Sequence, residues 1–317
     1  MGGRTTMLNA VLFETIPCPL CGDSRFEVVK PSKYAENVNE NELRQAYSAS
    51  SNHHLLDQVV RCESCSLHYV NPRPLPELII DSYSAAEDET FVAQNEGRIR
   101  GFKRTLGGVL KRKGMRSGSG LRFLDIGCAG GASLVAAKSL GFQPVGVEPS
   151  RWMADFGRRT YGVEIHDGIL EPGMFPPSSF DFITMWDVLE HVPDPGALLR
   201  LVHELLTPNG TFVMTYPDFK GLVGRMLGDK WPFWLSVHLL YYDRRTIVRQ
   251  LDACGFQTDA LMPYWPVLEL GYIFQRAAVY VPPANWLRTL AKAAGLDRIL
   301  VAFNMSQTVV IAHKGKG

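Results

Sequence analysis

The sequence has no long apolar run, almost no net charge and few cysteines for its length. No stretch of about 18 residues is free of charged residues and turn formers, so we expect no transmembrane helix. The 33 Lys and Arg residues balance 32 Asp and Glu residues, which leaves a net charge of +1. This charge gives no global field to gather a nucleic acid or an anionic membrane, although a local patch stays open. Six cysteines in 317 residues are too few for a disulfide scaffold.

Other absences narrow the class of protein further. Residues 1–19 lack the basic start, apolar centre and small-residue cleavage site of a secretory signal, so we expect a cytoplasmic location. The sequence has neither an internal repeat nor a low-complexity tract. What it does contain is ordinary for a globular protein, with 46% hydrophobic and 21% charged residues. Its length suits one large domain with a small one.

Composition divides the chain into three regions. Residues 1–80 hold two cysteine pairs and form a predicted zinc-ribbon domain, and residues 81–120 form a predicted helical linker or cap that ends in Ser-Gly-Ser-Gly. In residues 121–317, short apolar runs alternate with helical stretches, which is typical of βαβ units and a parallel sheet. These runs lie at 121–126, 144–147, 180–185, 211–215, 257–262 and 308–313. Helical insertions are expected at about 218–242 and 265–304.

A glycine-rich loop, Leu124–Gly131, follows the first apolar run. Small residues after a strand let the backbone turn tightly and approach a ligand, and the next helix offers its N-terminal N–H groups. Asp125 stands two residues before the first glycine, where a carboxylate suits a cationic ammonium group. Glu148 ends the next run, about twenty residues later, where an acid can bind a ribose diol. A glycine-rich loop alone is also typical of dehydrogenases, or of an α/β loop that binds nothing.

Five motifs follow one another along the chain, namely Leu124–Gly131, Glu148, Phe180–Asp181, Trp186–Val192 and Leu206–Gly210. Their order and spacing resemble those of class I S-adenosylmethionine-dependent methyltransferases. The resemblance implies an α/β fold with a seven-stranded, doubly wound, Rossmann-like sheet, and S-adenosylmethionine as the cofactor. The cofactor-binding residues that it implies are Asp125, Gly127, Cys128, Ala129, Gly131, Glu148, Pro149, Asp167, Gly168, Trp186 and Asp187. Ala129 replaces a glycine of the family, and we expect its methyl group to be tolerated.

Two Cys-x-x-Cys pairs mark a metal site near the start of the chain. Cys18 and Cys21 form one pair, and Cys62 and Cys65 form the other. Each pair is followed by a small residue, and two such knuckles together make a tetrahedral four-thiolate site. Zinc in a structural role is favoured over iron, because no cluster-binding run is present. The alternative is that the two cysteine pairs are unrelated and that one of them is redox-active.

The two cysteine pairs and the segment Leu67–Pro74 make this part of the chain similar to the N-terminal zinc ribbon of certain bacterial methyltransferases. Such enzymes act in glycan, deoxysugar or natural-product pathways. In the deoxysugar C-methyltransferases, a histidine of the same Glu-His pair serves as a base, which makes His191 the candidate base here. Glu190 would then orient the imidazole ring or bind substrate. A purely structural role for the pair, holding its loop, stays open.

We therefore expect methyl transfer to a small-molecule acceptor such as a sugar, a glycolipid or a natural-product intermediate, on oxygen, nitrogen or carbon. No nucleic-acid partner is expected, because the basic runs look like solvated helix faces. An RNA methyltransferase with a zinc ribbon and a non-catalytic protein that binds S-adenosylmethionine are the alternatives. Aromatic residues at 231–242 predict a core or lid, with peripheral membrane contact left open. The oligomeric state does not follow from the sequence.

Overall fold

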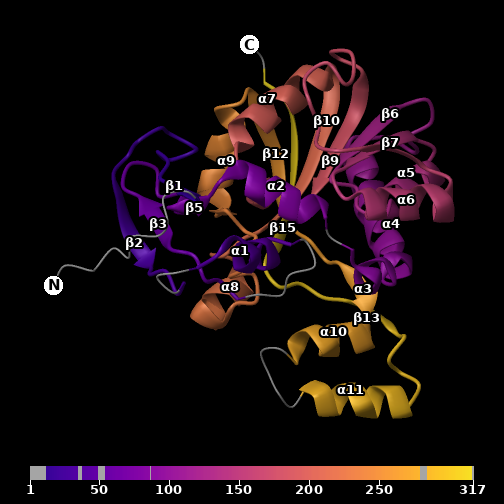
Figure 1. Ribbon diagram of the computed structural model, residues 1–317. Helices are drawn as coiled ribbons and strands as arrows, with labels where there is room; N and C mark the ends of the chain where they lie inside the picture. Colours follow the sequence, from indigo (N-terminus) through magenta and orange to yellow (C-terminus); the bar gives the residue numbers. More distant parts are fainter. Residues whose placement is uncertain (1–11, 35–37, 49–53, 86, 279–283, 316–317) are drawn as a thin grey trace.

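The seven-stranded sheet that the motifs imply is present. The computed structural model describes residues 12–34, 38–48, 54–85, 87–278 and 284–315 (Figure 1). The strand order is β12-β15-β10-β9-β6-β7-β8, and β15 alone runs antiparallel to its neighbours. The strands are β6 (Arg122–Ile126), β7 (Gln143–Glu148), β8 (Glu164–Asp167), β9 (Phe180–Trp186), β10 (Leu206–Pro217), β12 (Phe256–Pro263) and β15 (Gln307–Lys314).

Helices cover both faces of this sheet, because side chains along each strand alternate between the faces. Phe123 of β6 and Phe182 of β9 face a cluster with α4 and α5, whereas Leu124 and Ile183 face a cluster with α7 and α9. Helix α6 packs against β7 and β8. The covering helices are α4 (Asn95–Arg112), α5 (Ala132–Ser139), α6 (Arg151–Tyr161), α7 (Pro195–Leu205) and α9 (Arg244–Asp252).

A second, four-stranded sheet lies in the cysteine-bearing region and has the order β11-β4-β3-β2. Its strands are β2 (Phe26–Lys30), β3 (Val59–Cys62), β4 (His68–Val70) and β11 (Leu240–Tyr241). Strand β11 belongs to the insertion after β10, so a distant part of the chain completes this sheet. The first cysteine, Cys18, and Tyr69 of β4 belong to the same apolar cluster as Leu124 of β6. The two sheets therefore share one hydrophobic core.

The remaining elements are short and surround these two sheets (Figure 1). Strands β1 (Phe13–Glu14) and β5 (Arg73–Pro74) pair with each other, as do β13 (Val267–Glu269) and β14 (Leu300–Ala302). The helices are α1 (Glu40–Ala46), α2 (Pro76–Ser84), α3 (Glu89–Val92), α8 (Leu222–Leu227), α10 (Leu270–Ala277) and α11 (Ala284–Ala293), with 3₁₀ turns η1 (Leu189–His191) and η2 (Gly228–Lys230). None of the helices in the described ranges is both long and apolar enough to cross a membrane.

Strand β8 is the one strand of the large sheet that the apolar runs did not predict. Its sequence is Glu-Ile-His-Asp, and Ile165 is its only buried residue. The strand lies at the edge of the sheet, beyond β7. An edge strand needs few apolar residues, because only one side of it is paired and much of its surface meets water.

Replacing Gly97 by alanine should loosen the contact between α4 and β13. A methyl group there would lie 2.5 Å from the carbonyl oxygen of Val267, a backbone atom, so we expect the free energy of unfolding to fall by about 1–3 kcal/mol. Gly108, on the same helix, is the control. Alanine there meets no atom within 4 Å and should add up to about 1 kcal/mol through helix propensity. Urea denaturation measures both, and equal effects of the two variants would contradict the close approach.

Candidate functional site

The glycine-rich loop between β6 and α5 turns through left-handed backbone conformations. Gly127 has a φ of 69°, Ala129 of 46° and Gly131 of 77°. A side chain at Gly127 would also lie 2.7 Å from Val188, so glycine is required there on two counts. Ala129 adopts a conformation that is sterically costly for alanine, by roughly 1–2 kcal/mol. The loop has the form that brings backbone N–H groups close to a ligand.

Asp125 lies at the carboxyl end of β6 and is fully buried. The hydroxyl of Thr184 donates a hydrogen bond of 2.5 Å to its Oδ1, and the hydroxyl of Ser133 donates to its Oδ2. Burial raises the pKa of Asp125 to about 7, although both hydrogen bonds act in the opposite direction. A cationic group in front of this carboxyl would compensate for the lost hydration of its charge. The carboxyl is thus held in place and suits an ammonium ligand.

Glu148 ties the glycine-rich loop to the end of β7. One carboxylate oxygen accepts a hydrogen bond of 2.7 Å from the N–H of Ala129, and the other accepts one of 2.9 Å from the N–H of Ser150. Burial raises the pKa of this carboxyl, too, to about 7. Each carboxylate oxygen can accept a second hydrogen bond, so a ribose diol can still bind. The structure thus gives Glu148 a role in holding the loop, which the sequence did not predict.

The ends of β7 and β8 lie side by side. The N–H of Gly168 donates a hydrogen bond of 2.9 Å to the carbonyl oxygen of Glu148, and the residue after that glutamate is Pro149. Asp167 forms an ion pair of 2.8 Å with Arg158 of α6. The four residues that the sequence assigns to this side of the cofactor are thus neighbours at one edge of the sheet.

Trp186 ends β9 and Asp187 follows it, on the other side of the loop. The Thr215 hydroxyl donates a hydrogen bond of 2.8 Å to one carboxylate oxygen of Asp187, and the side-chain amide of Gln307 donates to the other. Burial raises the pKa of Asp187 to about 6. The ring of Trp186 stacks on that of Tyr264 at a centroid distance of 5.9 Å. These contacts connect three strands of the sheet at one place.

A cavity of about 500 Å³ begins at this edge of the sheet. Among the predicted cofactor residues, it is lined by Asp125, Gly127, Cys128, Ala129, Trp186 and Asp187. The other predicted cofactor-binding residues do not line the cavity; they are Gly131, Glu148, Pro149, Asp167 and Gly168. The cavity continues between α4, η2, α10 and the segment before β15, and most of these walls are apolar or aromatic.

Sequence reasoning missed several residues of this cavity. Asn95, Arg98 and Phe102 reach it from α4, Tyr264 reaches it from just after β12, and Gln307 reaches it from the start of β15. These residues lie on segments that meet the loop only in the folded chain. Phe91 of α3 also lines the cavity. The aromatic Trp231, predicted as core or lid, is buried and donates a hydrogen bond of 2.9 Å to the Met305 carbonyl oxygen.

Glu190, His191 and His238 form a cluster just beyond Asp187. Nδ1 of His191 lies 2.9 Å from the carbonyl oxygen of Val237, so this nitrogen carries the proton and Nε2 is left as the acceptor. Glu190 is fully buried, and neither of its carboxylate oxygens has a hydrogen-bond partner among the described residues. The two imidazole rings lie 4.8 Å apart. None of the three residues lines the cavity.

Comparison with known proteins identifies the family. A family model described as a methyltransferase domain matches residues 92–261. This chain belongs to that methyltransferase family. The predicted resemblance and the predicted fold class are thereby confirmed, and the matched residues include the glycine-rich loop, Glu148 and the Glu190-His191 pair.

Curated relatives of this methyltransferase match a shorter segment. This chain is 32% identical over 102 residues to the ubiquinone biosynthesis O-methyltransferase of Xanthomonas campestris pv. campestris (strain B100). The match covers 30% of this chain and 43% of the relative. The protein of the same name from Bradyrhizobium sp. (strain ORS 278) is 36% identical over 104 residues, covering 31% and 40%. The match thus spans less than half the length of either relative.

A solved structure supports the fold alone. This is the complex of the Trm112 methyltransferase activator of Haloferax volcanii with a methyltransferase. The similarity has a TM-score of 0.52 at 16% sequence identity, and it covers 74% of this chain and 98% of that chain.

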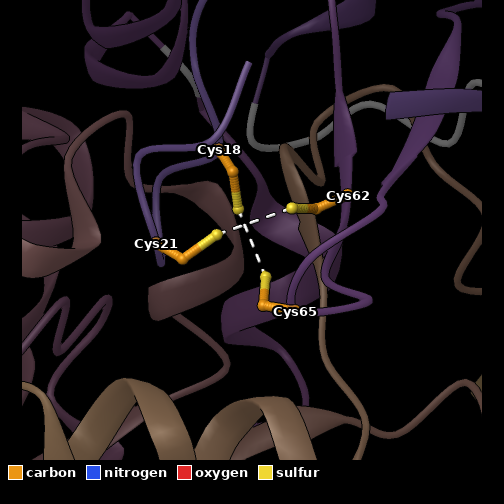
Figure 2. A group of neighbouring side chains, drawn as sticks. All are labelled: Cys18, Cys21, Cys62 and Cys65. Atoms are coloured by element: carbon orange, nitrogen blue, oxygen red, sulfur yellow. Dashed lines mark hydrogen bonds between the residues drawn. The ribbon is translucent and has the colours of Figure 1, made fainter. Parts of the chain in front are cut away.

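The four cysteines of this methyltransferase come together as the spacing predicts (Figure 2). The Sγ atoms of Cys18 and Cys65 lie 3.4 Å apart, and those of Cys21 and Cys62 lie 3.5 Å apart. A zinc ion with Zn–S bonds of about 2.3 Å requires its sulfur ligands to be about 3.8 Å apart. The four thiols therefore fit a tetrahedral zinc site with little movement.

Each knuckle is closed by a backbone hydrogen bond that shapes it for an ion. The N–H of Gly22 donates to the carbonyl oxygen of Cys18 at 2.8 Å, and the N–H of Ser66 donates to that of Cys62 at 3.0 Å. Both donors have left-handed φ values, 74° for Gly22 and 65° for Ser66. The two turns thus have the same form. The Glu190 cluster is the other group of described residues whose ligand atoms gather, within 4.8 Å of one another.

Replacing Cys62 by serine should remove zinc from the protein. The remaining three thiols cannot complete a tetrahedral site, and the free energy of metal binding is lost from the folding of the small sheet. Elemental analysis of purified protein should find one zinc ion per chain in the wild type and much less in the variant. Cys254→Ser, which changes a cysteine outside the cluster, should keep the ion. Wild-type protein with well under one zinc ion per chain would refute the site.

Removing the side-chain carboxylate of Asp125 or of Glu148 should weaken binding of S-adenosylmethionine. We expect Asp125→Ala and Glu148→Ala each to cost about 1.5–3 kcal/mol of binding free energy, the usual worth of a charge-assisted hydrogen bond. Titration calorimetry measures this, with the exposed Asp252→Ala as the control. Unchanged affinity in both variants, or tight binding of a nicotinamide dinucleotide in place of S-adenosylmethionine, would contradict the assignment.

The same affinity should depend on pH. The pKa of Asp125 is raised to about 7, and a cationic ammonium group binds its ionised form better. The affinity should therefore rise as the pH is raised through about 7, and this dependence should flatten in Asp125→Ala.

Proposed function

We propose that this protein transfers the methyl group of S-adenosylmethionine to a small-molecule acceptor bound in the cavity. The observation that carries this proposal is the continuity of the cavity. It has the buried Asp125 and the glycine-rich loop at one end, and a mostly apolar chamber at the other. A cofactor at the loop and an acceptor in the chamber would share one space without intervening water.

The chain's own residues would hold the two molecules in line. Asp125 would bind the ammonium group of the cofactor, and Glu148 its ribose. When bound, S-adenosylmethionine supplies a methyl group on a sulfonium, which is open to direct displacement. Trp186 and Tyr264 would then exclude water from the reacting centre, since they stack beside Asp187 on the cavity wall. Alignment of this kind is the main contribution of an enzyme to a displacement reaction.

His191 is the proposed base, and Glu190 its proposed partner. Burial lowers the pKa of His191 to about 4, which keeps the ring neutral near pH 7. Its Nδ1 is held by the Val237 carbonyl oxygen, so Nε2 is the atom that would accept a proton. Both residues follow Asp187 by only a few positions, although neither lines the cavity. The proposal therefore requires the acceptor to reach from the cavity toward Nε2.

The lining favours one kind of acceptor among sugars, glycolipids and natural-product intermediates. Most of the wall away from the loop is apolar, with Tyr272, Ile273 and Phe303 among its residues. A bare sugar would leave its hydroxyl groups without partners there, at a cost for each. A glycolipid, or a natural-product intermediate with an apolar part, would bury that part favourably. The name of the curated relatives, ubiquinone biosynthesis O-methyltransferase, agrees with an acceptor of this kind.

The direct test is formation of S-adenosylhomocysteine from S-adenosylmethionine in the presence of candidate acceptors. A panel of sugars, glycolipids and phenolic compounds would be compared, with Asp125→Ala protein as the blank. Turnover that depends on an acceptor and is lost in the blank supports the proposal. Tight cofactor binding with no turnover on any member of the panel would favour a non-catalytic binding protein.

Replacing His191 by alanine should leave cofactor affinity intact and reduce turnover by roughly 10²–10⁴-fold, the usual contribution of a positioned base. Only the neutral ring accepts a proton, so wild-type turnover at saturating S-adenosylmethionine should stay level down to about pH 5 and fall as the pH drops through about 4. His166→Ala, on the edge strand β8, is the control. Loss of stability and of cofactor affinity together, with an unchanged pH profile, would show that His191 is structural.

A further inference from the structure

Exposed apolar side chains gather on two insertions of the described chain. The structure has twelve large hydrophobic residues that are well exposed, and nine of them lie in α8 or between β12 and β15. The nine include Leu222 and Met226 of α8, which are 76% and 75% exposed. Positions four apart share one face of a helix, so these two side chains point the same way. A globular surface seldom concentrates apolar side chains in this manner without a partner.

Helix α11 has the pattern of a helix that lies in an interface. Ala284 and Ala291 are its buried residues, whereas Trp286, Leu287 and Leu290 are exposed, Trp286 by 64%. These three lie within one stripe of the helix, and the cations Arg288 and Lys292 lie outside it. Leu296 and Ile299 continue the apolar surface after the helix. A tryptophan and leucines on one side with cations on the other are typical of helices that bind a membrane surface.

The mouth of the cavity lies between these two insertions. Among the residues that line the cavity, the exposed ones are Leu227 at the end of α8, Lys230 in η2 and Arg276 in α10. Exposed lining residues mark where a cavity meets the outside. Figure 1 shows α8, α10 and α11 at the lower end of the molecule, away from the chain's C-terminus. The entrance to the cavity therefore lies between the two insertions that carry the exposed apolar residues.

The charge of the two insertions differs from that of the whole chain. Residues 222–230 and 265–299 together contain six Lys or Arg residues and three acids, in a chain whose net charge is only +1. One of the acids, Asp229, is paired with Lys30. No ion pair among the described residues involves Arg225, Lys230, Arg288, Lys292 or Arg298. The rim of the apolar surface is thus locally cationic.

We propose that α8 and the α10–α11 insertion form a docking surface for a lipid bilayer with anionic headgroups. Trp286, Leu290, Leu222 and Met226 enter the boundary of the bilayer, and the cations on the rim contact the headgroups. Arg276 and Lys230 then stand at the headgroup level, on either side of the cavity mouth. If the proposed methyl transfer is correct, an acceptor anchored in the bilayer can enter the cavity directly from it.

Sedimentation with lipid vesicles tests the docking surface without any need for turnover. The full chain is mixed with vesicles of phosphatidylcholine alone, or of phosphatidylcholine with phosphatidylglycerol. We expect binding to the mixed vesicles and little to the neutral ones, with the difference reduced by salt. Trp286→Ser should weaken binding by at least about tenfold. Val28→Ser, which removes another exposed apolar side chain from the edge strand β2, should leave binding unchanged.

A second pair of variants tests the charge. Arg288→Gln with Lys292→Gln should weaken binding by about fivefold for each charge. Lys111→Gln with Arg112→Gln, a basic pair at the end of α4, should have no effect. Circular dichroism and thermal melting check that each variant keeps its fold.

Two results would overturn the proposal. The first is wild-type protein that stays in the supernatant with mixed vesicles. The second is equal loss of binding in Trp286→Ser and Val28→Ser. Sedimentation velocity without lipid identifies the other occupant of this face, since a dimer that dissociates in Trp286→Ser would assign it to a second copy of the chain. If the protein binds vesicles but forms no S-adenosylhomocysteine, the docking surface is supported and the proposed methyl transfer is contradicted.

Discussion

The reversal of strand order at β6 constrains everything else in this molecule. From β6 the chain extends to β7 and β8 on one side and then returns to β9 and β10 on the other. No crossover covers the carboxyl ends of β6 and β9, so a crevice opens there. Asp125 lies near the carboxyl end of β6 and Asp187 directly follows β9, and Thr184 and Thr215 fix their side chains by hydrogen bonds. The carboxyl groups are therefore positioned by the most rigid part of the fold, before any ligand binds.

The crevice alone would be open to water, and segments from outside the central sheet enclose it. Helix α4 supplies Asn95, Arg98 and Phe102 to the cavity, and the insertion between β12 and β15 supplies the opposite wall. The two are in backbone contact at Gly97 and Val267, where no side chain fits between them. The sheet thus positions the two carboxyl groups, whereas α4 and the insertion between β12 and β15 determine the shape and polarity of the rest of the cavity.

The parts that the sequence predicts well are those with a local pattern. For six strands of the large sheet, the glycine-rich loop and both cysteine knuckles, the pattern that predicts the feature lies within a few consecutive residues. Strand β8 has only Ile165 to bury, so its apolar pattern is too weak to detect. The surroundings of His191 depend on Val237 and His238, about forty-six positions further along the chain, and no local pattern encodes such a contact. For the same reason the α4 wall could not be foreseen, because its cavity residues look like an ordinary helix face.

The segment that leads into strand β11 connects the cysteine-bearing sheet to the Glu190-His191 pair by hydrogen bonds. The N–H of Val70 donates a hydrogen bond of 2.9 Å to the carbonyl oxygen of Leu239, and the N–H of Leu239 donates one of 2.8 Å to that of Glu190. Only one residue thus separates the sheet of the second knuckle from the Glu-His pair. Because both contacts are backbone hydrogen bonds, the segment that contains Leu239 cannot shift without disturbing the cysteine-bearing sheet and the Glu190-His191 pair together.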